Sequence, residues 1–186
     1  MTTSTHLVLV GPMGAGKSSL GKRLAKTWGL AFVDLDREIE TQAGIDIPAI
    51  FASEGEIGFR HRECEALAEV LARATCVVAT GGGAVLAADN RALMRQQGFV
   101  VYLQIDVEEQ LARLTSDHSR PLLAGVGRAD VLTRLTAERA PLYAEVADLT
   151  FSPTGMSRTE AAERLAARLE PLWQRPAAPS RVADPT

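Results

Sequence analysis

The sequence predicts an α/β fold in which a parallel sheet is covered by helices on both faces. Short apolar segments alternate along the chain with longer amphipathic ones, as they do in βαβ units. The apolar segments, such as 6–10 (HLVLV), are continuous and rich in Val and Leu, which is typical of strands buried on both faces. Ligands of such sheets bind at the carboxyl ends of the strands, so three loops are expected at one edge: 11–18, 34–36 and 81–83.

The amino-terminal half is expected to supply three strands and four helices. Strands are predicted where short apolar runs occur, at residues 6–10, 31–34 and 76–79. Helices are predicted where apolar residues recur three or four positions apart, at residues 17–28, 36–43, 47–54 and 56–74. Gly29 is expected to close the first of these helices and Asp46 to cap the third, whose first turn tolerates Pro48.

The carboxyl-terminal half continues the alternation. Helices are predicted at residues 90–97, 106–114, 129–144 and 159–173, and strands at 99–105 and 149–151. Pro141 predicts a break or a kink in the third of these helices. The polar segment 115–128 holds a proline, two glycines and two arginines, which favours a functional lid. We therefore expect a single domain over residues 1–175, followed by a disordered, proline-rich tail over 176–186.

The composition is that of an ordinary globular chain, and it argues against several classes of function. Of the 186 residues, 46% are hydrophobic and 23% charged, and 20 basic and 23 acidic side chains give a net charge of −3. Proteins that coat nucleic acids usually carry a basic excess, and no apolar run approaches the roughly 20 residues of a membrane helix. The first residues do not resemble a signal peptide, and two cysteines make no disulfide framework. We expect a cytoplasmic protein without nucleic-acid or membrane partners.

Residues 11–18 (GPMGAGKS) fit the phosphate-binding pattern G-x-x-x-x-G-K-[ST]. The segment follows an expected strand and opens an expected helix, which is the context that this pattern requires. The N–H groups of the loop and of the helix N-terminus bind phosphate oxygens, the lysine reaches the β- and γ-phosphates, and the serine hydroxyl binds Mg²⁺. The residues predicted to bind ATP here are Gly14, Ala15, Gly16, Lys17, Ser18 and Ser19.

The strand at 76–79 lacks the acidic residue that many P-loop proteins place at its end for magnesium. Thr80 and three glycines follow it instead, and the nearest suitable acids are Asp34 and Asp36 at the end of the strand at 31–34. These two carboxylates are candidates for a metal and for a substrate hydroxyl. The alternatives are a helix N-cap for Asp36, a solvated strand end for Asp34 and a flexible loop for the glycines.

Three arginines are candidates for binding an anion. Arg60 precedes Glu63 at the i, i+3 spacing of a helix, Arg120 lies in the candidate lid, and Arg139 lies beside Glu138 in an expected helix. Taken singly, each arginine is as well explained as a solvated surface charge.

Taken together and in order, these segments resemble the shikimate kinases. The signature consists of GPMGAGKS (11–18), DLD (34–36), FRHRE (59–63), TGGG (80–83), RPLL (120–123) and RAPLY (139–143). The resemblance covers about residues 7–150, and its specific parts are TGGG and RPLL. It implies a three-layer α/β/α fold of the P-loop, nucleoside-monophosphate-kinase type, with a five-stranded parallel sheet. It also implies a lid at about 115–128 and substrate-binding helices at about 36–62.

The resemblance implies a reaction as well: ATP-dependent phosphorylation of shikimate to shikimate 3-phosphate, on the route to chorismate and the aromatic amino acids. By this resemblance Asp36 contacts the shikimate hydroxyls at the attacking oxygen, Arg60 and Arg139 hold the shikimate carboxylate, and Glu63 orients Arg60. The backbone that lies against the substrate is that of Gly81, Gly82 and Gly83, with Gly82 the best match for the N–H donor.

On the nucleotide side, the resemblance implies Mg²⁺ as the cofactor, held by Ser18 and, through water, by Asp34. Arg113 would pack on adenine, and Arg120 would swing from the lid onto the transferring phosphate. The residues implied to be catalytic are Lys17, Asp36 and Arg120.

The chemistry of shikimate agrees with this assignment, because arginine supplies the planar paired donors that a carboxylate accepts. Two other interpretations remain. One is a kinase of another small hydroxy acid such as gluconate, which gives no reason for TGGG and RPLL together. The other is a nucleotide-dependent switch, which does not require Asp36, Arg60 and Arg139. A monomer is expected, because kinases of this type need no second chain to complete the site.

Overall fold

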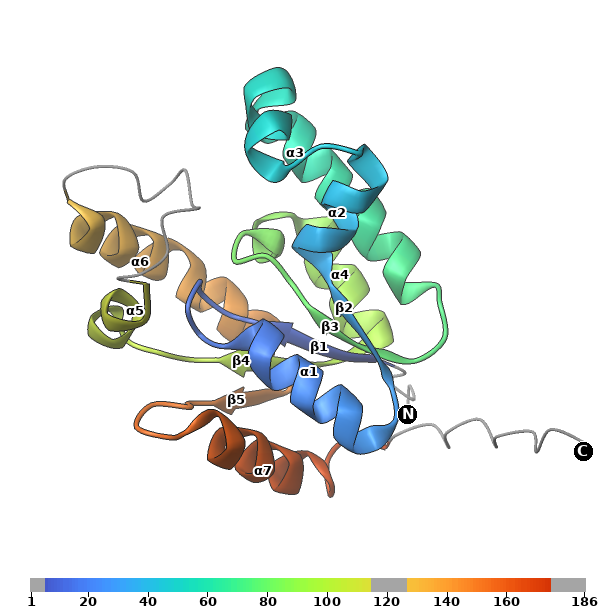
Figure 1. Ribbon diagram of the computed structural model, residues 1–186, viewed down its shortest axis with the longest axis vertical. Helices are drawn as coiled ribbons and strands as arrows, with labels where there is room; N and C mark the ends of the chain where they lie inside the picture. The colour runs from blue at the N-terminus through green and yellow to red at the C-terminus, as the bar shows by residue number, and fades with distance from the viewer. Residues whose placement is uncertain (1–5, 115–126, 175–186) are drawn as a thin grey trace, which may run out of the picture.

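The computed structural model of the chain describes residues 6–114 and 127–174. A five-stranded parallel sheet lies at its centre, in the order β2-β3-β1-β4-β5 (Figure 1). The strands are β1 (His6–Val10), β2 (Ala31–Asp34), β3 (Cys76–Ala79), β4 (Gly98–Leu103) and β5 (Leu149–Phe151). Helices cover both faces, so the predicted three-layer α/β/α class is confirmed.

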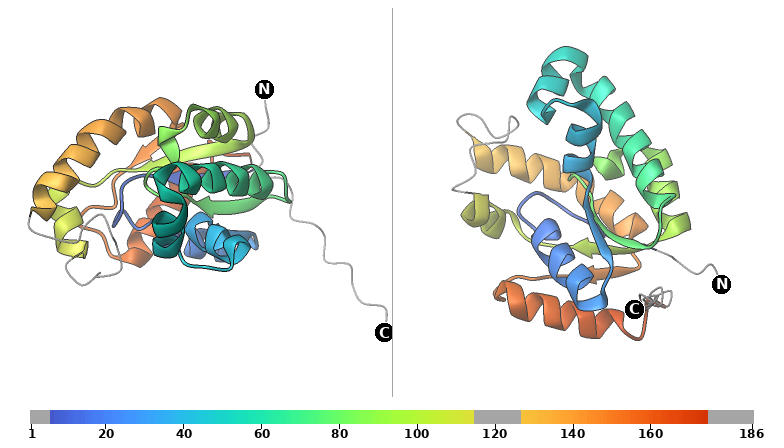
Figure 2. Two further views of the ribbon diagram at one scale, coloured as in Figure 1. Left: turned by 90° about the horizontal axis from the view of Figure 1, so that it is seen from above. Right: turned by 45° about the vertical axis from the view of Figure 1, so that its right-hand side comes forward.

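The central strand β1 sends side chains alternately into two apolar cores. Leu7 and Leu9 pack on one side of the sheet, against α1 (Lys17–Trp28) and α7 (Arg158–Leu169). Val8 and Val10 pack on the other side, where the core is completed by α2 (Leu35–Ala43), α3 (Ile47–Leu71), α4 (Ala88–Gln97) and α6 (Arg128–Val146). Figure 2 shows these two helical layers from two further directions. A parallel strand buried on both faces explains why β1 is apolar from Leu7 to Val10.

Two short helices follow the carboxyl ends of strands β3 and β4. The 3₁₀-helix η1 (Ala84–Leu86) follows the three glycines after β3, and α5 (Val107–Leu114) follows β4. Leu114 of α5 packs against Leu132 of α6 in a small separate apolar cluster. The candidate lid and tail, with Arg120, fall mostly on residues 115–126 and 175–186, which lie outside the described residues.

The break predicted at Pro141 is wrong, because α6 runs from Arg128 to Val146 with the proline inside it. Proline removes the hydrogen bond to the carbonyl of the residue four positions earlier, here Ala137. Both residues are exposed, so the freed carbonyl is open to solvent and the proline costs less there than in a buried helix. The other differences are at element ends: β4 starts at Gly98, α3 ends at Leu71, and α7 ends at Leu169.

The two helices predicted at 47–54 and 56–74 are the two halves of α3. Gly55 lies between them with φ 70° and ψ −173°, a conformation that glycine alone adopts readily. Asp46 caps the first half through a hydrogen bond from the Ala49 N–H at 2.9 Å, as predicted. The α3 element therefore consists of two helical segments joined at Gly55.

Across residues 6–114 and 127–174, none of the helices is both long enough and apolar enough to cross a membrane.

Candidate functional site

Two cavities meet at the carboxyl edge of the sheet. The larger has a volume of about 600 Å³ and is lined by the loop after β1, the start of α1 and the segment before α7. The smaller has a volume of about 460 Å³ and is lined by α2, both halves of α3 and the glycines after β3. Both are lined by Met13, Asp36, Gly81 and Gly82. The molecule therefore offers two neighbouring binding sites with a shared wall, as a reaction between two small molecules requires.

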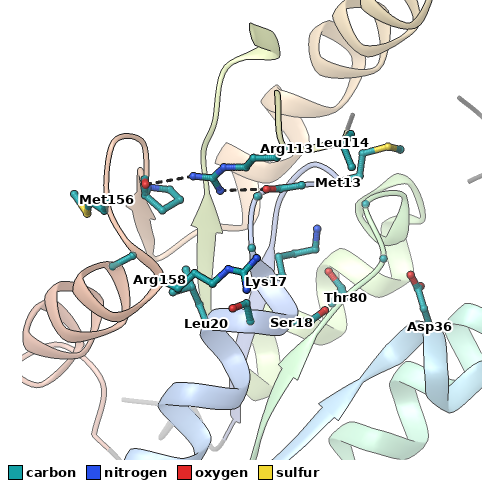
Figure 3. A pocket seen from close by; sticks show the side chains of 18 of the residues that line it. Met13, Lys17, Ser18, Leu20, Asp36, Thr80, Arg113, Leu114, Met156 and Arg158 are labelled. Carbon is teal, nitrogen blue, oxygen red and sulfur yellow. Dashed lines mark hydrogen bonds between the residues drawn. The ribbon is translucent and has the colours of Figure 1, made fainter. Parts of the chain in front are cut away.

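The loop after β1 has the backbone that a phosphate cradle needs. Gly11, Gly14 and Gly16 all have positive φ, and a side chain at Gly11 would come within 2.5 Å of the Leu103 carbonyl oxygen. The residues predicted to bind ATP, 14–19, all line the larger cavity. Lys17 is 9% exposed, and its Nζ donates to the carbonyls of Gly11 at 2.7 Å and Pro12 at 2.8 Å. Figure 3 shows its side chain beside Ser18 and Thr80.

Ser18 and Asp34 are brought together by the end of β2 and the first turn of α1. The Ser18 Oγ donates a hydrogen bond to the Asp34 Oδ2 at 2.6 Å. A hydroxyl and a carboxylate are the hard oxygen ligands that Mg²⁺ prefers. The described ranges contain no group of three His, Cys, Asp or Glu side chains suited to a metal. Mg²⁺ bound with a nucleotide needs none, because it takes one or two carboxylates and completes its shell with water and phosphate.

Asp36 does not act as the N-cap of α2. The helix starts at Leu35, with Asp34 at the cap position, and Asp36 lies in its first turn. The N-cap alternative for Asp36 is thus wrong, and the carboxylate instead lies between the two cavities. This position matches an acid that faces both a phosphoryl donor and an acceptor hydroxyl.

Close packing accounts for two of the three glycines after β3, Gly81 and Gly83. Thr80 anchors the loop, since its N–H and its hydroxyl both donate to the Leu9 carbonyl at 3.1 Å. A Cβ at Gly81 would lie 2.7 Å from the Asp36 Oδ1, and a Cβ at Gly83 would lie 2.4 Å from the Arg60 Nη2. None of the three glycines has positive φ. Space for the site side chains, rather than a left-handed backbone, therefore explains Gly81 and Gly83, whereas a Cβ at Gly82 would come no nearer than 3.6 Å to another atom.

The smaller cavity holds two arginines and a buried acid. Glu63 is 0% exposed and accepts a hydrogen bond from the Arg60 Nη1 at 2.6 Å. Burial raises the pKa of Glu63, and the Arg60 guanidinium opposes that rise. Arg139 is 8% exposed, and its charge also acts on Glu63. Neither the Arg60–Glu63 pair nor Arg139 is an exposed surface charge, so that alternative is wrong for both.

Within the described ranges, the Nε atoms of Arg60 and Arg139 are buried and have no hydrogen-bond partner. Buried donors without partners are costly in a folded protein, and a bound ligand that accepts from them is one way to offset that cost. Two guanidinium groups at one cavity therefore indicate an anionic ligand, for which a carboxylate is well suited.

The sequence did not indicate the apolar wall of this cavity. Phe51 and Phe59 stack with ring centroids 4.7 Å apart, and both line the cavity together with Ile47 and Pro48. In a continuous helix, eight residues would separate the two rings by about 12 Å along the axis. The break at Gly55 brings them together, and a pattern of sequence spacing does not contain that bend.

The nucleotide side has a further wall that the sequence assigned only in part. Arg113, which the resemblance places on adenine, lines the larger cavity; its Nη1 donates to the Gly14 carbonyl at 3.2 Å, and it pairs with Glu109. The segment before α7 adds Pro153, Met156 and Ser157, and the first residue of α7 adds Arg158; none of these was predicted from the sequence. The Ser-x-x-Glu pattern at 157–160 marks the start of α7, since the Ser157 Oγ accepts from the Glu160 N–H at 3.2 Å. Arg113 and Arg158 are both seen beside the loop in Figure 3.

A family model and the curated relatives described here all indicate the same family for this sequence. The family model described as "Shikimate kinase" matches residues 13–170. A curated shikimate kinase of Xanthomonas campestris pv. campestris (strain 8004) is 49% identical over 180 residues, which is 97% of this chain and 100% of the relative. One from Stenotrophomonas maltophilia (strain R551-3) is 50% identical over 175 residues, which is 94% of this chain and 97% of the relative.

Solved structures agree with these relatives. A shikimate kinase from Acinetobacter baumannii, solved in complex with shikimate, is 46% identical, with a TM-score of 0.82 over 90% of this chain and 92% of that one. A gluconokinase from Sinorhizobium meliloti 1021 reaches a TM-score of 0.53 at 17% identity over 91% of this chain and 97% of that one, which shows a shared fold alone. The family model, the full-length relatives and the structural neighbours agree: this chain belongs to the shikimate kinase family.

Proposed function

We propose that the protein transfers the γ-phosphoryl group of ATP to the 3-hydroxyl of shikimate. The observation that carries this proposal is the shared wall of the two cavities, where Asp36 lies between a phosphate cradle and a pair of arginines. ATP fits the larger cavity, with its phosphates on the loop at 11–18. Shikimate fits the smaller cavity, where its carboxylate meets Arg60 and Arg139.

On the acceptor side, the two arginines hold the shikimate ring by its carboxylate and so aim a ring hydroxyl at Asp36. Glu63 holds the Arg60 guanidinium through the 2.6 Å hydrogen bond. The Asp36 carboxylate accepts the proton of the attacking hydroxyl as its oxygen forms a bond to the γ-phosphorus. The bond from that phosphorus to the bridging oxygen breaks, and ADP leaves. The backbone of Gly81, Gly82 and Gly83 forms the floor of the acceptor site.

On the donor side, catalysis is mainly positioning and neutralisation of charge. The N–H groups of residues 14–19 hold phosphate oxygens, and Lys17 reaches the β- and γ-phosphates. Ser18 and Asp34 would hold Mg²⁺, which shields phosphate charge when bound. Arg113 supports the adenine end. Arg120 lies outside the described residues, and its role at the transferring phosphate rests on the resemblance of RPLL in the sequence.

The remaining organisation is proposed on the same basis. We infer a single kinase domain over residues 1–175 with a lid at about 115–128, substrate-binding helices at about 36–62 and a separate tail at 176–186. A monomer suffices, since one chain lines both cavities. ATP is the donor, and Cys64 and Cys76 are free thiols, so the cytoplasm is the proposed location.

The test is ADP release from ATP and Mg²⁺, measured with shikimate, with gluconate and with no acceptor. We expect release that rises and saturates with shikimate only. Equal stimulation by gluconate would instead favour a kinase of broader hydroxy acids. If neither acceptor changes the rate of ADP release, the result favours a nucleotide switch and contradicts the proposal.

A further inference from the structure

Tyr143 contacts the glycine loop but lines neither cavity. The side chain is 2% exposed on α6, and its hydroxyl donates a hydrogen bond to the Gly82 carbonyl oxygen at 2.5 Å. Gly82 itself lines both cavities. The phenol therefore holds the shared wall of the two sites from the outer side.

This hydrogen bond orients the whole peptide unit between Gly82 and Gly83, including its N–H group. The peptide unit that joins Gly82 to Gly83 is trans, as are all peptide bonds in the described part of the chain. In a trans peptide the C=O and the N–H point in opposite directions. Since the Gly82 carbonyl points at Tyr143, the Gly83 N–H points away from it. Glycine has no side chain to restrict rotation of this unit, so an outside contact is what holds it.

The same hydroxyl also interacts with Arg139, one helical turn earlier on α6. Burial raises the pKa of Tyr143, while the charge of Arg139 and a hydrogen bond with it oppose that rise. The phenol remains protonated and keeps its donor at neutral pH. Its ring is fixed by stacking on Tyr102 of β4, with centroids 5.1 Å apart and planes at 28°. Tyr143 thus joins an arginine of the acceptor cavity to the glycine wall.

We propose that Tyr143 is a positioning residue that holds the Gly82–Gly83 peptide and Arg139 in a fixed relation, so that both meet the acceptor molecule together. This inference rests on the proposed function, because it assigns the glycines and Arg139 to the shikimate site. The tyrosine touches no substrate, and its effect passes through the two groups that do.

The test compares Tyr143→Phe with Tyr102→Phe. Each variant removes one hydroxyl and keeps both stacked rings, but only the first removes the donor to Gly82. For Tyr143→Phe we expect the KM and the Kd for shikimate to rise roughly five- to tenfold, the cost of one hydrogen bond. The KM for ATP should change less than about twofold, because Gly83 and Arg139, which the tyrosine positions, line the acceptor cavity and not the nucleotide cavity. Tyr102→Phe should leave both constants near the wild-type values.

Three results would overturn the proposal: an unchanged shikimate KM in Tyr143→Phe, an equal rise for ATP, or the same rise in Tyr102→Phe. The last two would assign Tyr143 to the general stability of the sheet. Circular dichroism and Tm on each variant separate loss of fold from loss of positioning. A wild-type protein that does not phosphorylate shikimate contradicts the proposed function, whereas an active wild type with an unaffected Tyr143→Phe contradicts only the positioning role.

Discussion

The guanidinium of Arg60 lies directly against the backbone of Gly83. A Cβ added at Gly83 would stand 2.4 Å from the Arg60 Nη2, 2.5 Å from its Nη1 and 2.7 Å from its Cζ. Real Cβ atoms essentially never come closer than 3.0 Å to another heavy atom. Two motifs that are more than 20 residues apart in the sequence therefore form one structure, in which the last glycine of TGGG leaves room for the arginine of FRHRE.

Gly83→Ala should displace Arg60 and weaken shikimate binding while the fold survives, because the displaced group is the far end of a flexible side chain. We expect the shikimate KM to rise about tenfold or more, with a small change in Tm. Arg60→Ala should raise the shikimate KM far more than the ATP KM. If the two residues act through one contact, the double variant should be no worse than Arg60→Ala. Additive losses in the double variant would show that the two residues act independently.

Lys17→Ala should lower kcat by about a hundredfold or more, because the developing charge on the phosphates loses its main side-chain donor. Shikimate binding should remain, since Lys17 does not line the smaller cavity. Steady-state kinetics and a shikimate titration measure the two effects. Lys22→Ala is the matched control, as Lys22 is exposed on the same helix and lies over the Phe32 ring. A kcat near the wild-type value in Lys17→Ala would remove this lysine from the mechanism.

Arg62→Ala should loosen the bend in α3. Its Nε and Nη2 donate to the two carboxylate oxygens of Glu54, both at 2.8 Å, and so tie the halves on either side of Gly55. The first half carries Phe51 into the acceptor cavity. We expect the shikimate KM to rise roughly two- to fivefold with little change in Tm, because exposed ion pairs contribute little to stability.

The control for this prediction is Arg164→Ala, which removes an exposed ion pair with Glu160 on α7. It should leave the shikimate KM unchanged. The effect of Arg62→Ala should also shrink at high salt, where the wild-type pair is itself screened. A shikimate KM that is the same in both variants would mean that the Glu54 contact does not shape the cavity.

Glu63→Gln should change how stability depends on pH. Burial raises the pKa of Glu63 in the folded protein, so the native state binds this proton more tightly than the unfolded chain. The resulting stabilisation is complete below the usual carboxyl range, about 4, and is lost as pH rises through the raised value. Glutamine does not titrate. The free energy of unfolding of the variant, relative to that of the wild type, should therefore increase as pH rises.

Denaturant unfolding from acid to neutral pH measures this difference. Glu69→Gln removes an exposed carboxylate from the same helix and should follow the wild-type profile in parallel. If the pH profile of Glu63→Gln also runs parallel to that of the wild type, burial does not raise the pKa of Glu63.

The sequence predicted those parts of the site that lie within single continuous segments. The loop at 11–18 and the DLD segment need only a strand, a turn and a helix in order, and the strands β1, β2, β3 and β5 lie where apolar runs placed them. The prediction of a break at Pro141 was wrong, because a proline costs less where the carbonyl that it leaves without a hydrogen bond is exposed to solvent. Local propensity does not include that difference in exposure.

Contacts that depend on a bend in a helix or on how the helices pack were not predicted. The stacking of Phe51 on Phe59 depends on the bend at Gly55, and so does the ion pair between Glu54 and Arg62 on either side of it. The contact between Tyr143 and Gly82 spans 61 positions. Such pairs depend on the packing of α6 and α3 against the sheet, which no local pattern encodes.

The central claim is that one chain holds ATP and shikimate on either side of Asp36 and joins them. The most direct measurement follows both products during a shikimate titration. ADP is quantified enzymatically, and the phosphorylated ring is identified by phosphorus and proton NMR. We predict one shikimate 3-phosphate for each ADP at every shikimate concentration. ADP accompanied by inorganic phosphate, with no phosphoester on the ring, would contradict the account.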